Sequence, residues 1–123
     1  MNKRRQVVLV VEDSAMIRMS AVDLVLSAGY EALAASDADE AIRILEARSD
    51  IDLVFTDVQM PGTMDGIKLC HYIRERWPPV KLLVASGNAI LEESSLPSGS
   101  TFFSKPYDDH TITDAIGRML SEA

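Results

Sequence analysis

The stretch Leu53-Val54-Phe55-Thr56-Asp57 decides the fold, because four residues typical of a buried strand end at an aspartate. Two similar runs lie elsewhere in the chain. Val7 to Val11 is followed by Glu12-Asp13, and Thr101 to Ser104 is followed by Lys105-Pro106. If these runs are parallel strands of one sheet, their carboxyl ends meet at one edge. Three carboxylates and one ammonium then lie together, which suits a divalent cation and a phosphoryl group and points to phosphoryl transfer to Asp57.

Short apolar or β-branched runs alternate along the chain with segments of helical periodicity. The expected strands are Gln6 to Val11, Tyr30 to Ala35, Leu53 to Thr56, Val80 to Ala85 and Thr101 to Ser104. The expected helices are Ser14 to Ala28, Ala38 to Arg48, Gly66 to Trp77 and Asp109 to Ser121. This alternation predicts an α/β fold, a doubly wound parallel sheet with helices on both faces.

Ser14 is a good cap for the first helix, and Gly29 is its stop signal. The helical spacing places one set of residues on the inward face, namely Ile17, Ala21, Leu24, Val25 and Ala28.

Length and charge narrow the class of protein. The chain has 123 residues, which suits one domain, and a formal net charge of −7. An acidic surface disfavours binding to nucleic acid or to an anionic membrane. Cys70 is the single cysteine, so no intrachain disulfide can form, which fits a cytoplasmic protein.

Glu12 and Asp13 have an ordinary interpretation as a polar loop in which Asp13 caps the next helix, and Asp57 alone is a common way to end a strand. Their combination is more specific, because crowded carboxylates repel each other and Mg²⁺ relieves that repulsion with the oxygen ligands it prefers. Lys105 supplies a fixed positive charge opposite the metal. Ser86, before Gly87, can donate its hydroxyl to a phosphoryl oxygen.

Taken together, these motifs resemble the receiver domain of two-component response regulators. The resemblance runs from Val7 to about Leu120. It rests on Val11-Glu12-Asp13, Asp57-x-x-Met60-Pro61, Met64-Asp65-Gly66, Ser86 and Lys105-Pro106.

The resemblance implies a flavodoxin-like receiver fold with strand order 2-1-3-4-5. It also implies that Asp57 accepts a phosphoryl group from a histidine of a partner histidine kinase or histidine phosphotransfer protein. Asp13, Asp57 and the backbone carbonyl of Gln59 would hold Mg²⁺, with Glu12 acting through water.

By the same resemblance, Lys105 and Ser86 would bind two phosphoryl oxygens, and Phe102 would turn inward when Ser86 closes on the phosphate. Gln59 and Asn88 match positions that modulate loss of the phosphoryl group to water. The phosphorylated form would then bind a protein target.

Two stretches depart from the family pattern. The loop from Pro61 to Gly66 is one residue longer than the commonest form. The connection from Ser86 to Lys105 is a few residues short, and only Ala89 to Ser95 could be helical. Serine and glycine are weak helix formers and proline ends a helix, so we expect the fourth helix to be short or absent.

We expect residues 1–123 to be one stand-alone receiver domain with no output domain, a monomer or weak dimer, and no enzyme beyond its own phosphorylation and dephosphorylation. The alternatives are a receiver fragment of a hybrid kinase or larger regulator, and a small Mg²⁺-dependent phosphatase that forms an aspartyl phosphate. The phosphatase needs a proton-transferring residue where this chain has Gln59. A phosphate-independent binding module and a flavodoxin-like cofactor binder fit the acidic and basic set less well.

Overall fold

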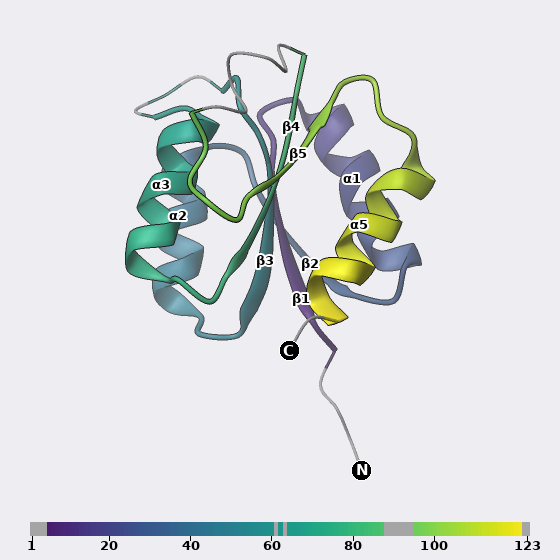
Figure 1. Ribbon diagram of the computed structural model, residues 1–123, viewed down its shortest axis with the longest axis horizontal. Coiled ribbons are helices and arrows are strands. Elements are labelled where there is room, and N and C mark those ends of the chain that lie inside the picture. Colours follow the sequence, from purple (N-terminus) through teal and green to yellow (C-terminus); the bar gives the residue numbers. More distant parts are fainter. Residues whose placement is uncertain (1–4, 61, 63, 88–94, 122–123) are drawn as a thin grey trace.

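The structure is a computed structural model that describes residues 5–60, 62, 64–87 and 95–121. Its centre is a five-stranded parallel sheet (Figure 1), whose strand order β2-β1-β3-β4-β5 is the one that the resemblance to receiver domains implies. The strands are β1 (Val7–Val11), β2 (Glu31–Ala35), β3 (Ile51–Asp57), β4 (Lys81–Ser86) and β5 (Thr101–Ser104). The helices are α1 (Ala15–Ser27), α2 (Ala38–Ala47), α3 (Gly66–Arg76) and α5 (Asp109–Ser121).

Helices cover the sheet on both faces, with α2 and α3 on one side and α1 and α5 on the other (Figure 1). The strand β1 shows how the sequence builds both layers. Val7, Leu9 and Val11 pack into the core under α2 and α3, whereas Val8 and Val10 pack into the core under α1 and α5. All five are fully buried, and burying one such side chain contributes roughly 1.5–3 kcal/mol. The central strands are therefore fixed from both sides.

Three helices begin at polar caps whose side chains accept a backbone amide of the first turn. Ser14 accepts from Ile17, Asp37 from Glu40 and Asp65 from Lys68. The predicted stop signal of α1 is also confirmed, since Gly29 follows the helix with a φ of 97°, a conformation that favours glycine.

The expected inward face of α1 is only partly correct. Ala21 and Val25 are buried, but Ile17 is 43% exposed and Ala28 is exposed. Ile17 lies in the first turn, where it lines a small cavity with Val10 and Phe55 of the sheet and, on its exposed side, an open recess with Lys105, Pro106 and Tyr107. The strand β3 is also longer than expected, because it includes Ile51, Asp52 and Asp57; Ile51 and Asp57 pair with neighbouring strands, and Asp52 lies at a register shift.

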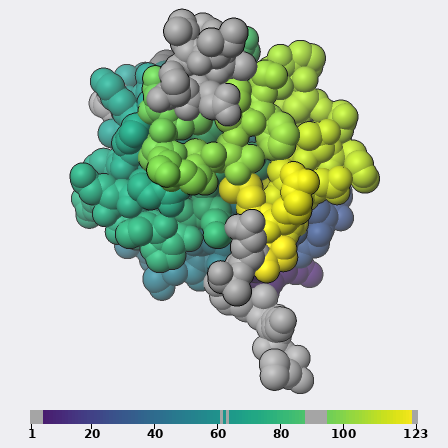
Figure 2. All heavy atoms as spheres, viewed as in Figure 1, coloured from purple at the N-terminus to yellow at the C-terminus, as the bar shows by residue number. Residues whose placement is uncertain are grey.

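The predicted short or absent fourth helix falls mostly on residues 88–94, which lie outside the described residues. The described part of this connection, residues 95–100, forms turns instead of a helix. It lies against α3, where the Nε2 atom of His71 is 2.7 Å from the carbonyl oxygen of Ser95 and Leu96 packs on the core. Figure 2 shows this segment in green, crossing the surface between α3 and the yellow end of α5.

Within the described part of the chain, none of the helices has the length and apolar character needed to span a bilayer. Cys70 is fully buried on α3, as expected of a small apolar residue, and burial raises the pKa of its thiol to about 12.

Gly66 anchors the loop that follows β3. Its amide donates to the carbonyl oxygen of Val58 over 2.7 Å. A Cβ atom at this position would overlap the backbone of Asp57 and Val58, so only glycine fits without a shift of the strand end.

We expect Gly66→Ala to lower the free energy of unfolding by about 1–3 kcal/mol, the usual cost of forcing an extra carbon into a packed site. Urea unfolding followed by circular dichroism measures this loss. Gly87→Ala is the matched control, because a Cβ there meets no atom within 4 Å. A Gly66→Ala protein as stable as Gly87→Ala would contradict the close approach.

Candidate functional site

Strand register brings the predicted residues to one edge of the sheet. Val11 of β1 pairs with Thr56 of β3, and Asp57 pairs with Ala85 of β4. Ser86 of β4 in turn pairs with Ser104 of β5. The polar residues Glu12, Asp13, Asp57, Ser86 and Lys105 therefore end or directly follow four adjacent strands.

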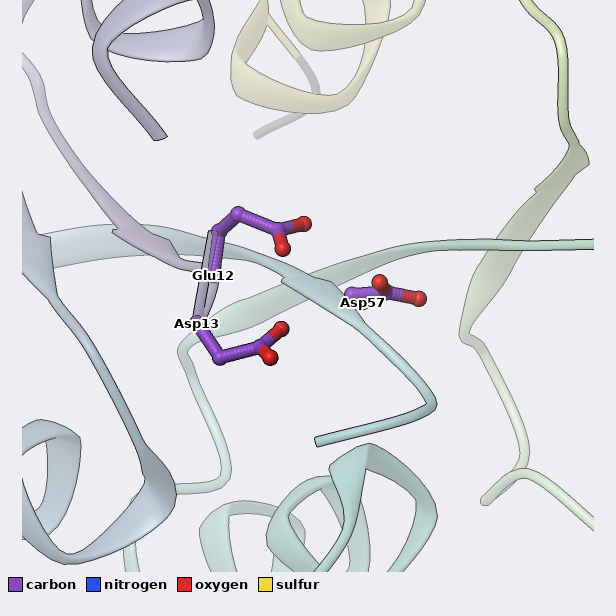
Figure 3. Close-up of side chains that lie close together, drawn as sticks. All are labelled: Glu12, Asp13 and Asp57. Atoms are coloured by element: carbon purple, nitrogen blue, oxygen red, sulfur yellow. The ribbon is translucent and has the colours of Figure 1, made fainter. Parts of the chain in front are cut away.

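Three of these residues form an acidic cluster. Glu12, Asp13 and Asp57 each offer a carboxylate oxygen, and these oxygens lie within 4.8 Å of one another. Figure 3 shows Glu12 and Asp13 extending from the end of β1 toward the side on which Asp57 lies. Glu12 is buried, Asp57 is half-buried and Asp13 is exposed, so the cluster is open to solvent on one side. An all-oxygen set of this size, with room for water, fits the coordination that Mg²⁺ prefers.

Lys105 is the cation of the site. Its Nζ atom lies 2.9 Å from Oδ2 of Asp57 and 4.0 Å from Oε1 of Glu12. Burial by itself would lower the pKa of Lys105, but its hydrogen bond to Asp57 and the charges of Asp57 and Glu12 outweigh burial and raise that pKa. The ammonium therefore stays charged and offsets part of the repulsion among the carboxylates. The peptide bond between Lys105 and Pro106 is cis.

The environment of Glu12 disfavours its charged form, in contrast to that of Lys105. Burial is the largest influence on its carboxyl and raises its pKa, and the nearby charge of Asp57 acts in the same direction. A hydrogen bond from the Ser14 amide and the charge of Lys105 act against this rise without cancelling it. Ionisation of Glu12 is thus less favourable in the fold than in water.

Ser86 is fully buried at the end of β4. Its carbonyl oxygen accepts the backbone amide of Lys105 over 2.9 Å, so the two residues expected to contact a phosphoryl group are joined through their backbones. Phe102 is half-buried opposite Val84 and packs against the core under α2 and α3.

The structure describes one of the two positions expected to modulate phosphoryl loss. Gln59 is exposed, and its backbone amide points to Oδ1 of Asp57 over 3.4 Å. Asn88 lies outside the described residues.

Sequence reasoning missed two neighbours of the site. Tyr107 lines a small cavity with Glu12, Asp57 and Lys105, and its ring packs against Phe55 with centroids 6.0 Å apart. Burial raises the pKa of its phenol. The second is Arg18, whose guanidinium reaches the backbone of Glu12 and Asp13. The sequence gives a signal for Tyr107, because this residue directly follows the Lys105-Pro106 motif. An arginine inside a helix gives no comparable signal.

Comparison with known proteins identifies the family. The family model for the response regulator receiver domain matches residues 8–117. The chain belongs to the response regulator receiver domain family. Receiver domains are signalling modules and not classical enzymes.

Two relatives and one solved structure illustrate the similarity. The response regulator protein FleR of Pseudomonas aeruginosa is 36% identical over 114 residues, which are 90% of this chain and 24% of FleR. The sensor histidine kinase RcsC of Escherichia coli K12 is 35% identical over 102 residues, which are 80% of this chain and 10% of RcsC. The crystal structure of the receiver domain of the hybrid histidine kinase CckA is 34% identical with a TM-score of 0.78, covering 93% of this chain and 98% of that one. This receiver domain thus spans a small part of FleR and RcsC.

The raised pKa of Glu12 predicts a pH dependence of stability. An acid whose pKa is higher in the folded than in the unfolded state stabilises the fold below its ordinary pKa of 4.5, and this contribution is lost as the pH rises through the folded value. In EDTA, Glu12→Gln should therefore be more stable than wild type at pH 7, and the difference should shrink as the pH falls toward 4.5.

Urea unfolding across this pH range measures the difference. Glu75→Gln, an exposed change on α3, is the control and should show no such trend. A Glu12→Gln protein that is less stable than wild type at pH 7 would mean that the carboxylate is favourable where it lies.

Proposed function

We propose that this receiver domain accepts a phosphoryl group on Asp57 from a phosphohistidine of a histidine kinase or histidine phosphotransfer protein, and that the phosphorylated form binds a protein target. The observation that carries the proposal is the position of Asp57, whose carboxylate lies 2.9 Å from Nζ of Lys105 and within 4.8 Å of the carboxylates of Glu12 and Asp13. The ammonium of Lys105 can neutralise charge on a phosphoryl group directly, and the carboxylates can do so through a divalent cation that they hold. A cytoplasmic location belongs to the proposal, since a single cysteine, Cys70, suits a reducing compartment.

In the proposed reaction a carboxylate oxygen of Asp57 forms a bond to phosphorus while the bond between phosphorus and the histidine nitrogen breaks. The nitrogen keeps the electron pair and takes up a proton, so the partner leaves with a neutral imidazole. Lys105 exchanges its contact with Oδ2 of Asp57 for one with a phosphoryl oxygen. Ser86, held to Lys105 through its carbonyl, donates its hydroxyl to a second oxygen.

Bound Mg²⁺ would neutralise charge on the transferring phosphoryl group. Glu12, Asp13, Asp57 and the backbone carbonyl of Gln59 are the residues that we assign to hold it. The donor chemistry supports this assignment, because three carboxylate oxygens converge within 4.8 Å and one side remains open for water. We also assign Gln59 and Asn88 the modulation of phosphoryl loss to water.

A partner protein needs a surface beside Asp57 on which to dock. The recess lined by Ile17, Pro106 and Tyr107 adjoins Lys105 and is largely apolar. Met16 and Met19, which lie with Ile17 on α1, are 80% and 66% exposed. Exposed apolar side chains of this kind favour contact with another protein, and methionine adapts to different partners.

A second candidate is the same reaction performed as one module of a hybrid kinase. The 35% identity to part of RcsC and the likeness to the CckA receiver domain favour it. The phosphatase hypothesis has less support, since the residue two positions after Asp57 is Gln59, whose amide cannot transfer a proton.

Phosphorylation should therefore require both Asp57 and Mg²⁺. Incubation with acetyl phosphate and Mg²⁺ should add the mass of one phosphoryl group to wild type, and either EDTA or Asp57→Asn should abolish this addition. Intact-mass spectrometry measures the yield. Asp23→Asn, an exposed change on α1, is the matched control and should be labelled like wild type. Labelling of Asp57→Asn at wild-type yield would refute the assignment.

Ser86 should couple phosphorylation to the region around Phe102. Wild type with beryllofluoride, a mimic of the phosphoryl group, should show NMR shifts around Phe102, since Ser86 moves toward the bound anion and vacates space beside β4. Ser86→Ala should still accept a phosphoryl group but lose most of these shifts. Ser104→Ala, at the paired position of β5, should retain them. Shifts of full size in Ser86→Ala would show that the coupling runs through other residues.

A further inference from the structure

We propose that Arg18 is a positioning residue for the acidic pair, one that fixes the backbone of Glu12 and Asp13 so that their carboxylates are held ready for Mg²⁺. The inference rests on the proposed function and adds a residue to it. Nη1 of Arg18 lies 2.8 Å from the carbonyl oxygen of Glu12 and 3.5 Å from that of Asp13. Arg18 is half-buried, and of its two contacts the one with Glu12 is partly buried while the one with Asp13 is exposed.

The place of Arg18 in α1 explains its reach. Its own amide donates to the carbonyl of Ser14 over 2.8 Å, which puts it one turn inside the helix. Side chains on a helix lean toward its N-terminus. A long side chain at this position therefore extends back over the first turn to the residues that precede the helix, where Glu12 and Asp13 lie.

The contacts of Arg18 leave the acidic groups available. Its guanidinium binds carbonyl oxygens, whereas the carboxylate of Glu12 accepts the Ser14 amide over 3.1 Å and lies 4.0 Å from Lys105. The amide of Glu12 continues the sheet by donating to Ala35 over 3.0 Å. Different partners thus hold the backbone and the carboxylate of Glu12. Arg18 is a partner of the backbone, and it also contacts the backbone of Asp13.

The site needs such a clamp because of its own charges. Three carboxylates within 4.8 Å repel one another, and Asp13 is the exposed member that can turn toward solvent. Mg²⁺ demands near-octahedral geometry with ligands at about 2.0–2.1 Å, whereas Ca²⁺ accepts looser and more variable ligand sets. A fixed backbone at Glu12 and Asp13 therefore favours Mg²⁺ more than Ca²⁺.

Arginine suits this task better than lysine. Its planar guanidinium has five N–H donors and can serve two carbonyl oxygens at once, whereas the lysine ammonium is a single compact group. Lysine at position 18 should therefore recover part of the function, and an apolar residue of similar length should recover none.

The test compares wild type, Arg18→Met, Arg18→Lys and the control Arg118→Met, an exposed change on α5. Isothermal titration with Mg²⁺ and separately with Ca²⁺ gives the two affinities, and urea unfolding in EDTA gives the stability. Arg18→Met should bind Mg²⁺ about 10-fold more weakly, the lower end of the usual loss when a group that orients metal ligands is removed. Its affinity for Ca²⁺ should fall less, and Arg18→Lys should lie between Arg18→Met and wild type.

A second readout is the rate of phosphorylation by acetyl phosphate as a function of Mg²⁺. Arg18→Met should need more Mg²⁺ to reach half its maximal rate, while the rate at saturating Mg²⁺ stays close to that of wild type. A purely structural role would lower the affinities for both cations equally or lower the maximal rate, and either result overturns the proposal.

The other possible results distinguish a failure of the role of Arg18 from a failure of the proposed function. Mg²⁺ affinity of Arg18→Met within twofold of wild type, or no recovery in Arg18→Lys, overturns the role of Arg18 and leaves the proposed function standing. Wild type that neither binds Mg²⁺ nor becomes phosphorylated overturns both. A shift in Mg²⁺ dependence confined to Arg18→Met, absent from Arg118→Met and partly restored in Arg18→Lys, supports the assignment.

Discussion

The pairing of β3 between β1 and β4, extended by β5 on the far side of β4, fixes where the groups of the site lie. Because the strands are parallel and in register, their carboxyl ends form one edge, and Asp57 lies at its centre. Both faces of these strands are buried under helices, so the register cannot slip without exposing a row of core side chains. The position of the chemistry is thus set by the hydrophobic core, and loops only complete it.

Burial of the Glu12 carboxylate works against the stability of the metal-free protein, whereas the ion pairs of Lys105 act in its favour. Glu12 is buried close to Asp57, and Lys105 offsets only part of the cost. A fold can carry such a cost where the surrounding strands are fixed by packing, as Val11 and Thr56 are on either side. The same crowding of carboxylates that destabilises the protein gives a divalent cation a reason to bind.

Sequence reasoning succeeded where one physical signal dominated. Val7–Val11 is apolar at every position because both of its faces are buried, so its strand was unambiguous. Ser14 and Gly29 marked the ends of α1 through local backbone chemistry that needs no tertiary contact. Since parallel strands end at one edge, the convergence of Glu12, Asp13 and Asp57 also followed from the sequence.

Sequence reasoning failed where the role of a residue depends on its position in the tertiary structure. Ile17 has the spacing of a core residue, but it lies in the first turn of α1 at an open recess beside Lys105, which leaves it 43% exposed. Arg18 looks like any solvated helix residue until the carbonyls of Glu12 and Asp13 are seen within its reach. Helical periodicity describes one element, whereas these roles depend on where the helix ends relative to its neighbours.

The contact of Gly66 with the end of β3 has a consequence for how this loop can change in length. The strand end and the start of α3 are joined directly by the hydrogen bond from Gly66 to Val58, whatever number of residues lies between them. An insertion after Met60 therefore adds chain between two points that stay together, and lengthening a loop slightly costs little entropy. Insertions and deletions can accumulate there over evolutionary time while Asp57 keeps its place.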